Sequence, residues 1–436
     1  MVRDGFDING DPMTRNIGFI STRFAGTDGV SLEASKWAQV LTEAGHACFW
    51  LAGELDRASE VSWLVPEAHF KHEKNQWINA RVFGRKSRKS NVTDTIHAVK
   101  VLIKVAIEEF IEQFRIDMLI VENALTIPMH IPLGVALTEI IAERQIPTIA
   151  HHHDFYWERT RFSVNAADDY LRMAFPPKLN SLEHVVINSA GQEELALRTG
   201  ASSVVIPNVL DFDHEVTVDP VQSALFRRSM GLNPEDKVIL QPTRIVQRKG
   251  IEHAIELVKH LEDPAYKLVI SHEAGDEGFE YADWLKSHAR EHGVDLRLFN
   301  MQVGDPFNGG GRDGSYTLWD IYPHADFITY PSLYEGFGNA FLEAIYFKKP
   351  LLINRYAIFV RDIEPKGFDL IVMDGFLTDR NVQNVRQVLE SVERREQMVT
   401  HNFNIAKRYY SYSVLRHALD MLIFNFFGVE GGASQC

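Results

Sequence analysis

Two glutamates spaced eight residues apart, Glu335 and Glu343, mark the stretch of this 436-residue sequence with the clearest chemical pattern. Residues 330–344 predict the end of a strand, a loop that contains Gly336 and Gly338, and a helix. Glycine lets such a loop bring backbone N–H groups close to sugar hydroxyls, and a carboxylate on the helix can accept hydrogen bonds from a ribose diol. The pattern predicts a sugar-nucleotide loop; the alternative is a purely structural turn.

A second segment, residues 242–250, carries Arg244 and Lys249 between a predicted strand and a predicted helix. A guanidinium group can hold phosphate oxygens in pairs, and Lys249 opens a helix whose free N–H groups also favour an anion. Together they could stabilise a departing diphosphate without a metal. The alternative is a solvated basic turn.

Three consecutive histidines, His151, His152 and His153, follow another predicted strand. Adjacent side chains leaving a strand point in alternate directions, so one ion cannot easily collect all three. We therefore predict no metal site and expect a histidine that faces a sugar, with Arg159 and Arg161 just beyond. The alternative is loop packing around Phe155, Tyr156 and Trp157.

An early loop between a strand and a helix, residues 24–33, contains Gly26, Asp28 and Gly29. In an open parallel sheet such a loop lies at the carboxyl edge, where ligands bind, and the following helix offers N–H groups to an anion. The glycines could instead serve only the turn.

The elements that must position these loops alternate as strand and helix along the whole chain, which is typical of a parallel α/β fold. Strands are predicted at residues 17–21, 46–51, 118–122, 148–151, 184–188, 238–242, 267–271, 296–298, 327–330 and 350–354, with helices at 31–44, 94–114, 131–144, 221–230 and 251–260. A glycine-rich stretch at 309–314 predicts a flexible loop.

The pattern restarts after Pro207-Asn208, which predicts two domains. We predict a flexible N-terminus at 1–15, an acceptor domain at 16–208, a donor domain at 209–408 and a helix at 409–430 that returns to the first domain. The last predicted helix, 411–427, has an apolar stripe that packs on the chain or forms a dimer contact; the stripe comprises Tyr412, Leu415, Leu419, Leu422 and Phe426.

Composition narrows the class of protein. The 45 basic and 59 acidic residues give a net charge of −14, which disfavours nucleic-acid binding but permits a local anion site. Two cysteines, no apolar run long enough to span a bilayer and no signal-peptide pattern predict a cytoplasmic protein.

These segments together resemble the retaining glycosyltransferases of family 4, which have the GT-B fold. The Glu335…Glu343 spacing matches the family's signature of two glutamates separated by seven residues. The other parts follow in the family's order: a glycine loop, a histidine after a strand, Pro207-Asn208, then the Arg/Lys pair. The resemblance covers residues 17–427 and implies two Rossmann-like domains whose cleft closes on the donor.

The resemblance also implies residue roles. His153 would contact the donor sugar near its reacting carbon, Arg244 and Lys249 the diphosphate, Glu335 the sugar and Glu343 the ribose. The implied donor site comprises Gly29, Asn208, Arg244, Lys249, Glu335, Gly336, Phe337, Gly338, Asn339 and Glu343. The sequence departs from the family at the early loop, where Thr27-Asp28 separate two glycines that are often adjacent.

Arg23, Arg159 and Arg161 are expected near the cleft, with Asp28, and predict a small anionic acceptor. Residues 151–159 resemble enzymes that build glycerate-containing compatible solutes such as mannosylglucosyl-phosphoglycerate. The implied acceptor is a glucosyl-glycerate or its phosphate, and the implied donor is of the GDP-mannose or UDP-glucose type.

The implied reaction retains anomeric configuration by front-face attack, because no carboxylate in these motifs is an evident nucleophile. No cofactor is required beyond the nucleotide sugar, although stimulation by a divalent metal stays open. Two other classes remain: a trehalose-phosphorylase-like enzyme that uses inorganic phosphate, and a non-catalytic sugar-nucleotide sensor.

Overall fold

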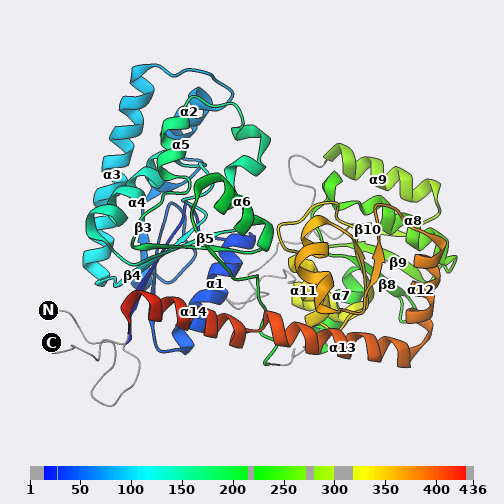
Figure 1. Ribbon diagram of the computed structural model, residues 1–436. Coiled ribbons are helices and arrows are strands. Elements are labelled where there is room, and N and C mark those ends of the chain that lie inside the picture. The colour runs from blue at the N-terminus through cyan, green and yellow to red at the C-terminus, as the bar shows by residue number, and fades with distance from the viewer. Residues whose placement is uncertain (1–13, 27, 215–219, 272–278, 299–317, 429–436) are drawn as a thin grey trace, which may run out of the picture. The chain divides into compact units, whose positions relative to one another are not determined.

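The computed structural model describes residues 14–26, 28–214, 220–271, 279–298 and 318–428. Contacts divide the chain into two compact units: unit 1 holds residues 1–207 and 415–436, and unit 2 holds residues 208–414. Each unit contains one sheet, and all paired strands in both sheets are parallel (Figure 1). The predicted α/β class is confirmed. The loop predicted at 309–314 and the N-terminal residues 1–13 lie outside the described residues.

The sheet of unit 1 has the strand order β3-β2-β1-β4-β5-β6-β7. The strands are β1 (Asn16–Ile20), β2 (Ala47–Ala52), β3 (Ser62–Leu64), β4 (Met118–Glu122), β5 (Thr148–His152), β6 (Leu182–Val186) and β7 (Val204–Val205). The helices between them are α1 (Gly29–Glu43), α2 (Glu73–Val82), α3 (Ser90–Phe114), α4 (Ile131–Arg144), α5 (Asp168–Ala174) and α6 (Ser189–Thr199).

The two faces of this sheet meet different helices, because successive side chains of a strand point to opposite faces. Leu119 and Val121 of β4 belong to one buried cluster with residues of α3 and α4. The ring of His151, on β5, instead stacks on Trp37 of α1, with ring centroids 4.2 Å apart. Since Glu122 pairs in register with His151, its side chain also points to the α1 face.

The sheet of unit 2 has the strand order β10-β9-β8-β11-β12-β13. The strands are β8 (Lys237–Gln241), β9 (Tyr266–Ile270), β10 (Leu296–Leu298), β11 (Ala325–Tyr330), β12 (Leu351–Asn354) and β13 (Ile371–Met373). The helices are α7 (Pro220–Ser229), α8 (Ile251–Leu261), α9 (Phe279–Glu291), α10 (Leu318–Ile321), α11 (Asn339–Tyr346), α12 (Asp379–Glu390) and α13 (Val392–Tyr410).

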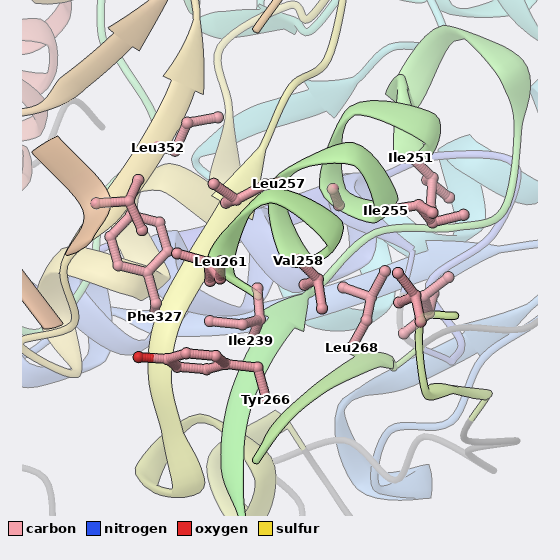
Figure 2. Packing of buried hydrophobic residues seen from close by; sticks show 14 of the residues in the cluster. Ile239, Ile251, Ile255, Leu257, Val258, Leu261, Tyr266, Leu268, Phe327 and Leu352 are labelled. Atoms are coloured by element: carbon pink, nitrogen blue, oxygen red, sulfur yellow. The ribbon is translucent and has the colours of Figure 1, made fainter. Parts of the chain in front are cut away.

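The core of unit 2 forms where α8 covers this sheet. Figure 2 shows Ile255 and Val258 of α8 beside Ile239 and Leu268 of the central strands. These four side chains are at most 6% exposed. Burying each large apolar side chain contributes roughly 1.5–3 kcal/mol, so this contact fixes α8 and the loop that leads into it.

The last helix, α14 (Tyr412–Phe427), belongs to unit 1 from Leu415 onward. Arg416 pairs with Glu43 of α1 at 2.8 Å, and the guanidinium of Arg15 lies 4.1 Å from the ring centroid of Phe427. Most of the apolar stripe is buried within the chain; its most buried members are Leu415, Leu419 and Leu422. Packing on the chain therefore accounts for the burial of these three side chains.

Three strands that the sequence pattern did not predict all lie at sheet edges: β3, β7 and β13. They have three, two and three residues. Such short runs carry too few alternations to show a period, and only their neighbour in the sheet holds them extended.

Two buried histidines support unit 1 only in the neutral form. Nδ1 of His130 accepts a hydrogen bond from the backbone N–H of Leu133 and so caps α4, while Nε2 donates to the carbonyl of Glu67. Nε2 of His184 lies 3.1 Å from the carbonyl of Pro177, and its Nδ1 lies 2.8 Å from Nε2 of His152. Burial lowers the pKa of both His130 and His184 to about 4.

We predict that acid destabilises unit 1 through these histidines. Their folded pKa of about 4 lies below the ordinary 6.5, so the unfolded chain binds more protons as the pH falls. The contribution of the two neutral histidines to the free energy of unfolding is complete above about pH 6.5 and is lost as the pH falls toward 4. The melting temperature should fall as the pH is lowered across that range. The variant His130→Asn keeps a capping acceptor but cannot titrate, so its melting temperature should depend less steeply on pH. An unchanged slope in this variant would contradict the role of His130.

Candidate active site

The predicted site residues cluster at the carboxyl ends of the strands, beside the switch point of each sheet. In unit 1 the strand order reverses direction between β1 and β4, and in unit 2 between β8 and β11. Ligands of open parallel sheets bind at the carboxyl edge beside such a point. The loops after β8 and β11, with the start of α11, carry most of the predicted donor residues of unit 2, and the loops after β1 and β5 carry the predicted site residues of unit 1.

The loops after β8 and β11 meet through an ion pair between Lys249 and Glu335. The two side chains are only 10% and 11% exposed. Arg248 supports the same junction: its guanidinium lies 3.6 Å from the Glu335 carboxylate and donates to the carbonyl of Tyr334, and its own carbonyl accepts from Leu333. The structure therefore brings together two residues to which the resemblance gave separate roles.

Burial lowers the pKa of Lys249, and the charge and hydrogen bond of Glu335 oppose this shift. Arg248 and Arg244 add positive charge that lowers it further. Removing one partner of such a buried pair leaves an uncompensated charge, which is strongly destabilising. The pair thus fixes the geometry of both loops.

Two glycines allow the loops to approach so closely. Gly250 has φ 60° and Gly338 has φ 123°, both in the region that favours glycine. A Cβ at Gly250 would lie 2.6 Å from the carbonyl oxygen of Pro331, and one at Gly338 would lie 2.6 Å from the hydroxyl of Tyr356. That hydroxyl donates to the carbonyl of Phe337, inside the predicted donor loop.

The start of α11 is tied to the residue that begins unit 2. The side-chain amide of Asn208 donates to Oδ1 of Asn339 at 2.6 Å. Four residues further along α11, Glu343 accepts a hydrogen bond of 2.7 Å from Tyr322, whose buried side chain holds the carboxylate in place. Arg244 is exposed, and Gly336 is half-buried in the loop.

In unit 1 the carboxylate of Glu122 lies between two histidines. Its oxygens lie 3.0 Å from Nδ1 of His151 and 3.1 Å from Nε2 of His153. Glu122 is fully buried, while the His153 side chain is 12% exposed. His152 points to the opposite face, toward His184, as the alternation of a strand requires.

The charges in this cluster reinforce one another. Burial alone would raise the pKa of Glu122, but the charges and hydrogen bonds of His151 and His153 lower it to about 2. Burial lowers the pKa of His153, yet the hydrogen bond and charge of Glu122 outweigh this effect and raise it. The contact therefore favours the ionised form of Glu122 and the protonated form of His153.

Glu122, His151 and His153 are also the set in the described part of the chain whose ligand atoms are close enough for one metal ion. His152 points away from His151 and His153, as expected for consecutive residues of a strand. The expectation of no metal site did not consider the carboxylate of Glu122 as a further ligand. Metal-ligating histidines almost always donate their second nitrogen, whereas Nε2 of His151 is buried without a hydrogen-bond partner. We therefore interpret the set as a hydrogen-bonded cluster.

The arginines predicted to bind the acceptor already have acidic or aromatic neighbours. Arg23 pairs with Asp28 at 2.8 Å, and Asp28 also caps α1 through Val30 and Ser31. Gly29 is the first residue of that helix. Arg159 pairs with Asp154, and the Arg161 guanidinium lies 4.4 Å from the centroid of the Phe162 ring.

Sequence reasoning missed Glu122, Trp37 and Tyr322. The signal for Glu122 was present, since a carboxylate closes an otherwise apolar strand and shares a face with His151. It also missed the cluster of His69, Phe70 and Lys71, which belongs to a segment with no periodic pattern. This segment lies against the end of β2, where a Cβ at Gly53 would be 2.1 Å from the backbone nitrogen of His69.

Comparison with known proteins agrees with this geometry. Residues 222–404 match the family described as glycosyl transferases group 1. The mannosylglucosylglycerate synthase of Petrotoga mobilis is 33% identical over 383 residues, covering 81% of this chain and 86% of that protein. The enzyme of the same name from Thermotoga maritima is 30% identical over 441 residues, covering 92% and 98%. The chain belongs to the group 1 glycosyltransferases.

Two further comparisons refine the assignment. A mannosylglucosyl-3-phosphoglycerate synthase of Petrotoga mobilis is 23% identical over 277 residues, covering 60% of this chain and 50% of that protein. Among solved structures, a glycosyltransferase from Rickettsia africae matches with a TM-score of 0.69 at 13% identity, over 95% of this chain and 99% of that one. The fold of this glycosyltransferase is GT-B, with two Rossmann-like domains. Among its described helices, none has the length and apolar character to cross a membrane.

We predict that the donor loop of this glycosyltransferase does not tolerate a side chain at Gly338. In Gly338→Ala the new Cβ would meet the Tyr356 hydroxyl at a strained φ, which should cost roughly 1–3 kcal/mol from strain and displace the loop. Gly367→Ala is the matched control, since φ is 83° there but nothing lies within 4 Å. Denaturant unfolding and transfer rates should both show the larger loss for Gly338→Ala. Equal losses would mean that close packing at Gly338 is unimportant.

Proposed function

We propose that this glycosyltransferase moves a mannosyl group from GDP-mannose to glucosylglycerate, with retention of configuration. The observation that carries the proposal is the Lys249–Glu335 pair at the β8/β11 switch point, with Glu343 on the helix that follows. The chain's relatives at 30–33% identity are mannosylglucosylglycerate synthases. The acceptor is proposed without a phosphate because those relatives match more strongly and more fully than the phosphoglycerate enzyme.

In this reaction the bond between the anomeric carbon and the diphosphate oxygen breaks, and the acceptor hydroxyl forms the new bond to that carbon. Charge grows on the departing phosphate, so fixed cations beside it stabilise the transition state most. Lys249 is suited to this role because its ammonium is already desolvated and held in place by Glu335. Arg244, exposed on the same loop, supplies the second cation, and we assign no step to a metal.

The remaining groups of unit 2 recognise the donor. Glu343, oriented by Tyr322, accepts hydrogen bonds from the ribose diol, and the 336–339 backbone binds the sugar hydroxyls. In unit 1, His153 contacts the donor sugar near its reacting carbon. The acceptor attacks from the front face, because no carboxylate in these loops is assigned as a nucleophile. The proton of the acceptor hydroxyl passes to the departing phosphate oxygen.

The acceptor carboxylate is proposed to bind beside Phe70, between two cations. The guanidinium of Arg23 lies 5.5 Å and the ammonium of Lys71 5.8 Å from the Phe70 ring centroid. Both charges also lower the pKa of His69, after burial as the main cause and against the opposing charge of Glu54. Arg23 and Arg159 each already pair with a carboxylate, Asp28 and Asp154 respectively. Arg23 is preferred because Lys71 adds a second cation at the same aromatic ring.

The donor half of the proposal is tested by nucleotide binding. GDP and GDP-mannose should raise the melting temperature more than UDP, ADP and their glucose conjugates, since a ligand that binds only the folded state stabilises it. Release of GDP should then require both GDP-mannose and glucosylglycerate. If phosphate and a disaccharide gave the shift instead, the enzyme would be a phosphorylase; donor binding without turnover on any acceptor would indicate a sensor.

The proposed acceptor site is tested with two acceptors, one that carries the carboxylate and one that lacks it. Arg23→Ala should raise the KM for glucosylglycerate about tenfold, the equivalent of about 1.4 kcal/mol for one charged contact. It should leave the KM for glucosylglycerol, which lacks the carboxylate, nearly unchanged. Arg159→Ala is the matched control and should affect both acceptors alike. An equal effect of Arg23→Ala on both acceptors would rule out this carboxylate site.

A further inference from the structure

We propose that Glu122 is a positioning residue for the transfer: it fixes the ring of His153 through Nε2 and supplies the negative charge that keeps the ring a double hydrogen-bond donor. The inference rests on the proposed contact of His153 with the donor sugar. Nothing in the sequence pattern assigned a role to Glu122, which closes strand β4.

His153 is held at two points by consecutive residues, Glu122 at the end of β4 and Asn123 just after it. Its ring nitrogen Nε2 lies 3.1 Å from the carboxylate of Glu122, and its backbone N–H donates to Oδ1 of Asn123 at 2.9 Å. The backbone N–H of Asn123 in turn donates to the carbonyl of His151. Asn123 has φ 57°, a left-handed conformation that asparagine tolerates better than most residues. The end of β4 therefore contacts both the ring and the backbone of His153.

The carboxylate of Glu122 is itself immobile. A fully buried carboxylate must be paired and hydrogen-bonded, because its desolvation is costly. His151 provides a second donor through Nδ1 at 3.0 Å, and the His151 ring stacks on Trp37. Turning away from His153 would cost Glu122 one of the two histidine contacts that compensate its charge.

The other charged groups that face His153 have partners of their own. Glu33 of α1, whose charge also favours the imidazolium, pairs with Lys36 at 2.8 Å. Asp154, which follows in the chain, pairs with Arg159. The flanking histidines of β5 differ: His151 donates to the same carboxylate, and burial keeps His152 neutral by lowering its pKa. Among the carboxylates that the structure describes, Glu122 is the one in hydrogen-bond contact with the His153 ring.

This contact determines what His153 presents to a substrate. With Nε2–H bound to Glu122, the nitrogen left for the sugar is Nδ1. In the imidazolium form Nδ1–H donates a hydrogen bond to a sugar oxygen, whereas in the neutral form Nδ1 can only accept one. Loss of the His153 proton at high pH should therefore reduce the rate.

The test compares Glu122→Gln with Glu183→Gln, a control on β6 outside this cluster. In Glu122→Gln we expect kcat to fall about tenfold to hundredfold, the size typical of outer partners of functional histidines, with little change in the KM for the donor. The alkaline limb of the pH–rate profile should move about one unit lower, because the negative charge beside the imidazolium is gone.

A second readout does not depend on turnover. Titration of histidine Cε1 resonances, assigned with His153→Asn, should show a lower pKa for His153 in Glu122→Gln than in wild type or Glu183→Gln. Should Glu122→Gln fail to fold, Glu122→Asp, which keeps the charge one methylene further away, should give an intermediate pKa and kcat. An unchanged His153 pKa and an unchanged alkaline limb would overturn the proposal. If wild type transferred no mannose, the proposed function would fail, but the His153 titration would still decide the role of Glu122.

Discussion

Each domain holds a carboxylate, fully or largely buried, against which a basic side chain from a neighbouring loop or strand lies. In unit 2 the carboxylate of Glu335 pairs with Lys249, and in unit 1 that of Glu122 pairs with His153. Burying either charge alone would cost several kcal/mol, so each pair fixes the relative position of the two segments that carry it. Both pairs lie beside the switch point of a parallel sheet, where the fold exposes backbone and side chains to ligands.

The rest of each sheet keeps these pairs in place. Buried apolar strands set the register that puts Glu122 opposite His151, and the core beneath α8 fixes the loop that carries Lys249. Gly250 and Gly338 remove the side chains that would prevent the loops of unit 2 from closing on each other. The same arrangement supplies what transfer from a nucleotide sugar needs, namely fixed cations for the leaving phosphate and oriented acceptors for the sugar and ribose.

The sequence predicted the two-domain α/β fold and the loops of the site because both depend on local patterns. Buried strands such as Met118–Glu122 were predicted with their observed bounds, and the Glu335…Glu343 spacing predicted the family that the comparisons show. It did not predict contacts that depend on register between strands, such as Glu122 with His151. It also missed the short edge strands and the segment around Phe70, which have no period and are held by tertiary contacts. The residue roles in catalysis stay predictions.

The most direct test of the proposed transfer is the structure of the product. The enzyme would be incubated with GDP-mannose and glucosylglycerate, and the isolated product would be analysed by NMR for its linkage and anomeric configuration. The account predicts a single mannosylglucosylglycerate whose new mannosyl bond has the α configuration of the donor. A β-linked product would contradict retention, and free mannose or unchanged acceptor would contradict the proposed transfer itself.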